Sequence, residues 1–205
     1  LKNDNLKYIS NRNEKVLAFI KHLTFIDKNK IILLGHSEGS RIAFEIAKKK
    51  KNKISRLIYL SGNPFGRYMN LVARKRNIET EKDLLKNDTI FDNWEIILKN
   101  KNNANYEKGG DSYMSTYIYS QPHYKEFLKI GIPVFIGYGT RDDSSLFNDL
   151  FHFYVFNEHK DNFYFKSYTG LEHSFFPLND NGEVNYEDSK INIVIDDILI
   201  WLQNK

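Results

Sequence analysis

The chain of 205 residues contains no cysteine. This excludes disulfide bonds, a thiol nucleophile and cysteine metal sites, and it leaves the cellular compartment open. No run approaches the roughly 18 apolar residues of a spanning helix, so we expect no membrane span. No signal peptide opens the chain, which begins at Leu1, so we expect that upstream sequence was removed or left out. We expect a cytoplasmic protein, with a secreted or periplasmic location left open by that N-terminus.

A large excess of charge of either sign is also lacking. Lys and Arg total 30 and Asp and Glu total 26, which gives a net charge of +4. The lysines are spread along the chain, and the run from Lys48 to Lys51 falls at the end of an expected helix, where cations suit the helix dipole. We therefore interpret the charge as a solvated surface and expect no nucleic-acid partner.

Hydrophobic residues make up 41% of the chain, which is ordinary for a globular protein, and the length is typical of one domain. Apolar residues recur at helical spacing in four segments, 13–26, 41–51, 146–158 and 191–202. Short apolar runs typical of strands occupy 31–34, 54–60, 133–138 and 163–168. The alternation predicts an α/β fold with a mostly parallel sheet flanked by helices, in which residues 31–34 are buried on both faces.

Residues 63–125 differ from the rest because they are polar, rich in aromatic side chains and without a strand period. Helical patches are expected at 81–85 and 94–98. We expect a cap inserted in a single domain that spans residues 1–205. Its aromatic residues, Phe65 and Tyr68 among them, are candidates for a substrate pocket, and the alternative is that they pack the cap onto the domain.

The segment Gly35-His36-Ser37-Glu38-Gly39 matches the pattern G-x-S-x-G. It directly follows an expected strand and precedes an expected helix, which is the setting of a nucleophile elbow. We expect Ser37 at a strained corner with positive φ, and glycine at 35 and 39 because strand and helix approach closely there. The helix N-terminus directs its free N–H groups to the same place.

Residues 31–40 resemble the elbow of α/β-hydrolase-fold serine hydrolases, in particular the esterase and prolyl-oligopeptidase-like branch. Residues 133–142 resemble the acid segment of that family, and residues 170–175 resemble its histidine loop. The resemblance covers residues 16–60 and 132–202 and leaves out the insertion. It implies Ser37 as nucleophile, Asp142 as acid and His173 as base, in the chain order of the family.

The positions of the neighbouring residues favour Asp142 as the acid and His173 as the base. Asp143 adjoins Asp142 but precedes a helix, so capping is its expected role. His173 follows the last expected strand in a loop, whereas the other histidines lie in helices, in the elbow or in the insertion: His22, His36, His123, His152 and His159. For His36 we expect the backbone to matter more than the ring, and we keep it beside Phe65 and Tyr68 as a candidate substrate contact. His123 is a weaker candidate.

The backbone N–H of Glu38 is the expected first donor to an oxyanion. The family takes its second donor from a loop upstream of the elbow, and no such loop precedes residues 31–34. The family also places another strand beside that segment, and without it an apolar strand edge is left open. We therefore expect the C-terminal part of a longer hydrolase. A minimal variant and an inactive relative are the alternatives.

The chemistry expected from these residues is hydrolysis of a carboxylic ester through a Ser-His-Asp triad and an acyl-enzyme. A serine peptidase, a thioesterase and an inactive binding protein of the same fold are the alternatives. No cofactor and no metal are expected, because no histidine or carboxylate pair stands at ligand spacing. The expected partner is a small ester or peptide, and the oligomeric state is left open.

Overall fold

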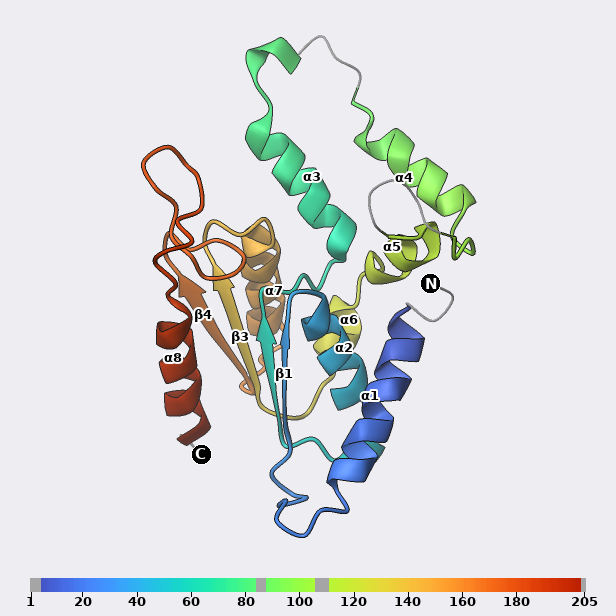
Figure 1. Cartoon of the computed structure of the whole chain (residues 1–205), viewed down its shortest axis with the longest axis vertical. Helices are drawn as coiled ribbons and strands as arrows, with labels where there is room; N and C mark the ends of the chain where they lie inside the picture. The colour runs from blue at the N-terminus through green and yellow to red at the C-terminus, as the bar shows by residue number, and fades with distance from the viewer. Residues whose placement is uncertain (1–4, 84–87, 106–110, 204–205) are drawn as a thin grey trace.

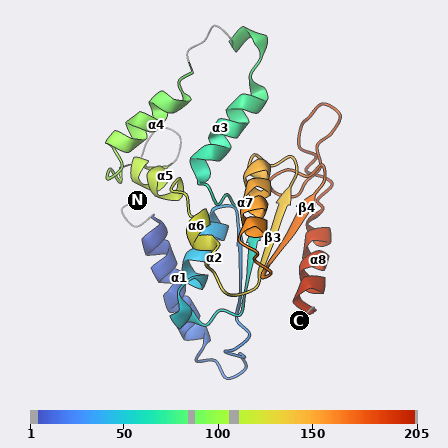
Figure 2. The same ribbon diagram turned by 180° about the vertical axis from the view of Figure 1, so that it is seen from behind.

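The computed structural model describes residues 5–83, 88–105 and 111–203. Its centre is a sheet of four parallel strands in the order β1 (Ile32–His36), β2 (Arg56–Leu60), β3 (Val134–Gly139) and β4 (Phe163–Tyr168). One face packs on α1 (Leu6–Ile20), α2 (Glu38–Ala47), α6 (Tyr124–Phe127) and α7 (Ser145–Asn157), and the other on α8 (Ile191–Gln203) (Figures 1 and 2). The prediction of an α/β fold with a parallel sheet flanked by helices is confirmed.

Strands β2 and β3 form the middle of the core, because helices cover both of their faces. Leu57 and Tyr59 of β2 are fully buried in the layer with α2 and α7, whereas Ile58 and Leu60 are buried in the layer with α8. The alternation follows from the two-residue period of a strand. Such strands carry continuous apolar runs, which explains why the sequence revealed them.

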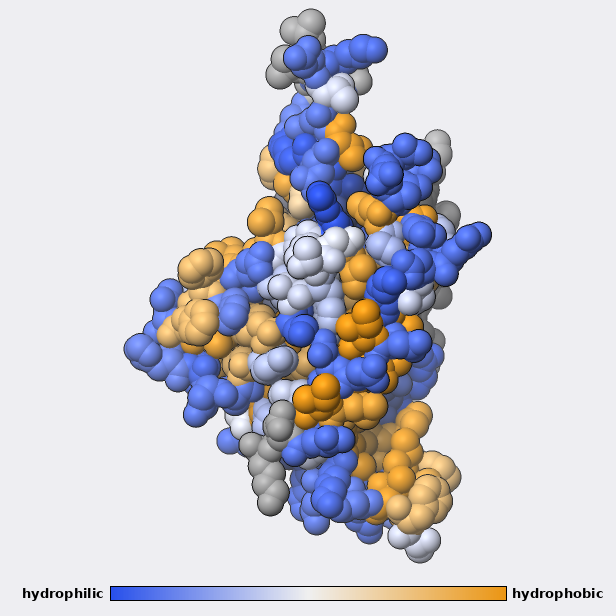
Figure 3. All heavy atoms as spheres, turned by 90° about the vertical axis from the view of Figure 1, so that its left-hand side faces the viewer, coloured by the Kyte–Doolittle hydropathy of each residue, from blue (hydrophilic) through white to orange (hydrophobic). Residues whose placement is uncertain are grey.

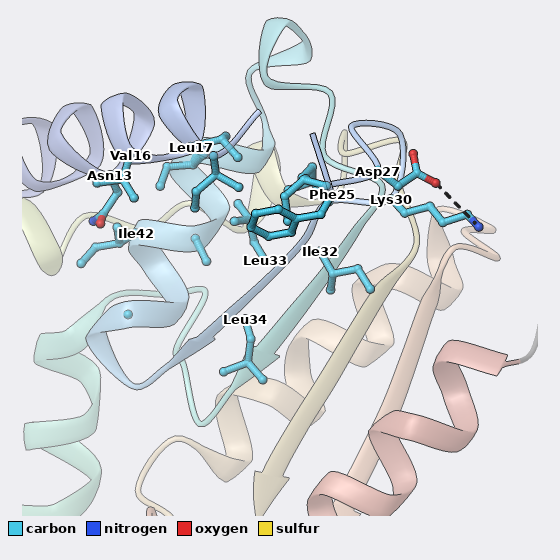
Figure 4. A pocket seen from close by; sticks show the side chains of 16 residues that line it. Asn13, Val16, Leu17, Phe25, Asp27, Lys30, Ile32, Leu33, Leu34 and Ile42 are labelled. Atoms are coloured by element: carbon cyan, nitrogen blue, oxygen red, sulfur yellow. Dashed lines mark ion pairs between the residues drawn. The ribbon is translucent and has the colours of Figure 1, made fainter. Parts of the chain in front are cut away.

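Strand β1 is different, and the prediction that residues 31–34 are buried on both faces is wrong. Leu33 packs on the core beneath α2, but Ile32 and Leu34 are 40% and 57% exposed. Among the described residues, no strand pairs with the outer edge of β1. A groove of about 570 Å³ runs along this edge, lined by α1, α2, β1 and the loop before β1 (Figure 4). Within the described residues, the β1 edge of the sheet is thus open and apolar.

Between β2 and β3 the chain forms α3 (Arg67–Ile78), a 3₁₀ turn (Glu81–Asp83), α4 (Ile90–Lys99) and α5 (Tyr113–Tyr119). These elements, called the cap below, project beyond the carboxyl ends of the strands (Figure 1). The helical patch predicted at 81–85 is only this turn, and residues 84–85 lie outside the described residues. The patch at 94–98 lies within α4. On the face shown in Figure 3 the outer end of the cap is mostly hydrophilic.

Helices α1, α2, α7 and α8 overlap the predicted segments with shifted ends, whereas α6 was not predicted. Helix α1 begins earlier than expected because the side chain of Asn5 accepts a hydrogen bond from the Tyr8 N–H at 3.0 Å and caps it. Helix α2 ends at Ala47, short of the lysine run. None of the helices in the described part of the chain is long and apolar enough to span a membrane.

Candidate active site

Ser37 lies at the junction of β1 and α2 with φ 57° and ψ −124°. Its N–H donates to the Leu60 carbonyl of β2 at 2.9 Å, and the Ser40 hydroxyl donates to its carbonyl at 2.5 Å. A Cβ on Gly35 would lie 2.2 Å from the Gly39 carbonyl oxygen, so the turn requires glycine at 35. A Cβ on Gly39 would meet nothing within 4 Å. The expectation that close approach also requires glycine at 39 is therefore wrong.

The structure brings the three predicted triad residues together at the carboxyl edge of the sheet. His173, in the loop after β4, places its Nε2 2.8 Å from Ser37 Oγ and its Nδ1 2.9 Å from Asp142 Oδ2. Asp142 follows β3 and is buried, and its Oδ1 accepts from the Ser144 N–H at 2.9 Å. An ionised carboxylate at this position requires the proton on Nδ1, which leaves Nε2 free to accept the serine proton.

The charges around His173 favour its protonated form. The hydrogen bond to the Asp142 carboxylate is the main reason that the pKa of His173 is raised above its ordinary value, while partial burial opposes that rise. The neighbouring Glu172 also raises this pKa, and the Arg74 guanidinium lowers it. The Glu172 carboxylate is itself fixed, since it accepts from the N–H groups of Ser174 and Phe176 at 2.7 and 3.0 Å.

The backbone of His173 is held from the neighbouring strands. Its carbonyl oxygen accepts from His36 Nε2 at 2.9 Å and from Ser61 Oγ at 2.8 Å. His36 ends β1, and Ser61 follows β2 with a positive φ of 49°. We expected the backbone of His36 to matter more than its ring, yet the ring makes this contact. Neither residue was assigned this role from the sequence, because the partner lies more than 100 residues away.

With this geometry known, the chain can be compared with other proteins. No family model and no curated protein matches it. Solved structures do, several of them at 12–19% identity. The monoacylglycerol lipase of Paleococcus ferrophilus has 17% identity and a TM-score of 0.55, over 98% of this chain and 76% of that one. Est1E from Butyrivibrio proteoclasticus with ferulic acid bound has 18% identity and a TM-score of 0.61, over 98% and 69%. The alpha/beta hydrolase GrgF from Penicillium sp. sh18 has 12% identity and a TM-score of 0.56, over 97% and 72%.

The chain has the α/β-hydrolase fold. The second aspartate after β3, Asp143, forms an ion pair with Arg74 of α3, with 2.6 Å between Oδ2 and Nε. The expected capping role is absent, since no side chain caps α7 and Asp142, not Asp143, binds the Ser144 N–H. Asp143 therefore ties the cap to the body beside the triad.

Two candidate substrate contacts lie in packed regions of the cap and its base. Phe65 stacks on Tyr124 with 4.7 Å between ring centroids. Tyr68 is buried in the cap core beside Trp94, and its hydroxyl donates to the Ile90 carbonyl at 2.5 Å. Both residues thus pack the cap or its base, as the alternative interpretation expected. The lining of the cavity beside Ser37 includes neither residue, and it does not include His36.

That cavity measures about 170 Å³ and lies between α2 and the cap. Twelve residues line it, none with an aliphatic side chain: Ser37, Glu38, Ser40, Arg41, Tyr59, Ser61, Gly62, Asn63, Arg67, Asn70, Tyr119 and His123. His123 is buried, with Nε2 3.2 Å from the Tyr59 hydroxyl. The sequence carried one signal for the missed residues, because Arg41 stands only four positions after Ser37, in the first turn of the helix that follows the elbow.

In the part of the chain that the structure describes, neither the groove along β1 nor a cluster of metal ligands adds to this triad. The larger groove along β1 contains none of the three triad residues. Within residues 5–83, 88–105 and 111–203, no three histidine, aspartate or glutamate side chains gather as metal ligands.

Proposed function

We propose that this chain is a serine hydrolase that cleaves carboxylic esters through an acyl-enzyme. The observation that supports the proposal most is the continuous series of hydrogen bonds from Ser37 through His173 to Asp142, next to a cavity. A serine is a weak nucleophile unless a base is in contact with it, and the base must be oriented by a third group. A monoacylglycerol lipase among the structures of the same fold agrees with this proposal.

In the proposed reaction, His173 Nε2 takes the Ser37 proton as Oγ attacks the carbonyl carbon of the ester. The backbone N–H of Glu38, the first residue of α2, donates to the oxyanion, supported by the positive end of the helix dipole. His173 then gives its proton to the leaving alcohol, and the acyl group stays on Ser37. A water molecule then attacks the acyl carbon with His173 as base, which releases the acid and returns the proton to Ser37 Oγ. In both steps Asp142 orients the imidazole and stabilises its charged form.

We assign ester cleavage because it is the least demanding of the reactions that this chemistry supports. The test is labelling of the purified chain with a fluorophosphonate, which reacts with an activated serine. Labelling should vanish in Ser37→Ala and persist in Ser189→Ala, a matched control at an exposed serine. Turnover of a panel of simple esters should fall about a millionfold in Ser37→Ala. A folded chain that neither reacts with the probe nor cleaves any ester would refute the proposal.

A further inference from the structure

We infer that the ester cleaved at this site carries a small substituent with a carboxylate, which Arg41 binds in the cavity beside Ser37. The inference rests on the proposed function and specifies its substrate class. It depends on three observations: the polar lining and small size of the cavity, the position of Arg41 relative to the nucleophile, and the buried guanidinium N–H groups that lack an acceptor.

The cavity favours a small and polar group. Its volume of about 170 Å³ is less than a third of that of the groove along β1. The side chains in its wall are hydroxyls, amides, two guanidiniums, a carboxylate and an imidazole, with no aliphatic side chain. A long acyl chain would find neither the room nor the apolar contacts there. A short chain that ends in a charged or hydrogen-bonding group suits this lining.

Arg41 lies in the first turn of α2, directly after the elbow, and it lines the same cavity as Ser37. Its Nη2 pairs with Glu45 at 3.1 Å, and only 14% of the side chain is exposed. The Nε and Nη1 atoms are buried and have no hydrogen-bond partner among the described residues. Burial lowers the pKa of Arg41, and the neighbouring Glu45 carboxylate opposes that shift. An incoming carboxylate would supply the missing acceptors.

The other charges in this region already have partners. Arg67 is held by Glu38 at 3.3 Å and by Asp111 at 2.8 Å. Lys48 lies between the carboxylates of Glu45 and Glu126, at 2.8 and 2.7 Å. Within the described lining, Arg41 is therefore the cation with buried N–H groups left for a ligand oxygen.

Two pairs of substrates of matched shape test the inference. Ethyl hydrogen succinate and ethyl succinamate differ only by a carboxylate against a carboxamide on the acyl side. Acetoxyacetate and acetoxyacetamide make the same comparison on the alcohol side. We expect kcat/KM, measured by titration of the released acid, to favour the charged member of one pair by roughly ten- to a hundredfold. The pair that shows this preference locates the carboxylate.

The variants Arg41→Gln and Arg41→Lys separate binding from folding. The preference is a ratio measured within one variant, so a partly unfolded preparation does not change it. The ratio should fall to about one in Arg41→Gln and be only partly reduced in Arg41→Lys. It should be unchanged in Arg12→Gln, which removes an exposed arginine of α1. Equal rates on both members of both pairs would overturn the inference, and so would an unchanged preference in Arg41→Gln. In either case, fluorophosphonate labelling of Ser37 would still support the proposed function. Loss of both labelling and turnover overturns the proposed function and the inference with it.

Discussion

Replacement of Asp142 by asparagine tests the proposed triad sharply, because a second aspartate follows it and serves as a matched control. The Asp142 side chain is almost fully buried, and its Oδ2 accepts the Nδ1 proton of His173 at 2.9 Å. Asparagine keeps the size but loses the charge, and its amide group favours the imidazole tautomer with the proton on Nε2. That proton would face Ser37 Oγ, so the base could no longer accept. We expect kcat to fall about ten-thousandfold in Asp142→Asn.

The control variant Asp143→Asn removes the ion pair with Arg74, whose side chain is 64% exposed. Ion pairs of this kind contribute about 0–1 kcal/mol to stability, and none of the triad atoms bonds to Asp143. We therefore expect kcat within about fivefold of the parent. Circular dichroism and thermal melting would establish that both variants fold, and fluorophosphonate labelling should be slowed in Asp142→Asn but not in Asp143→Asn.

The pH dependence gives a second readout of the same pair of variants. The reaction needs a neutral His173, so kcat/KM should fall as the pH drops through the pKa of this residue. Because the Asp142 carboxylate raises that pKa, the midpoint should lie above the ordinary value of about 6.5. In Asp142→Asn the midpoint should move to lower pH, whereas in Asp143→Asn it should stay close to that of the parent. A larger loss from Asp143→Asn than from Asp142→Asn would refute this reasoning.

Two further changes probe the scaffold of the site. Ser61→Ala removes one of the two donors to the His173 carbonyl, so kcat should fall about tenfold with KM little changed. A change confined to KM would contradict the role of Ser61 in positioning His173. Gly35→Ala places a Cβ against the Gly39 carbonyl and should lower the free energy of unfolding by roughly 1–3 kcal/mol, or Tm by about 2–12 °C. Gly39→Ala should leave Tm unchanged or slightly higher, because nothing lies within 4 Å, and equal melting of the two variants would count against the close-approach argument.

The sheet and its flanking helices were predictable because their burial leaves a pattern in the sequence. Strands β2 and β3 are covered on both faces, and the helices on them show an apolar stripe. Strand β1 has the same kind of sequence but lies at an edge, and no local pattern distinguishes an apolar strand at an edge from one in the middle. Helix α3 left no pattern, because Tyr68 is its only buried residue and most of its other side chains are polar.

The triad was predictable for another reason. Ser37 and its elbow form a short local motif, and the order of serine, acid and histidine limits the choice of partners. The choice of Asp142 over Asp143 depended on one position after β3, and the geometry places Asp142 against His173 and Asp143 against Arg74. The hydrogen bonds that hold the His173 carbonyl could not be predicted, since they depend on how the ends of β1 and β2 meet a loop far along the chain.

Packing involves several of the aromatic side chains in the cap and at its base. A small unit of helices has little apolar surface, so burial of large rings is its main source of stability. Tyr68 and Trp94 meet this need and are consumed in packing, as is Phe65 at the base of the cap. The cavity beside Ser37 is lined instead by polar side chains and two tyrosines, and its cap residues are Arg67, Asn70 and Tyr119. The polar side chains of this lining are therefore better candidates for ligand contacts than Phe65 and Tyr68, which packing already occupies.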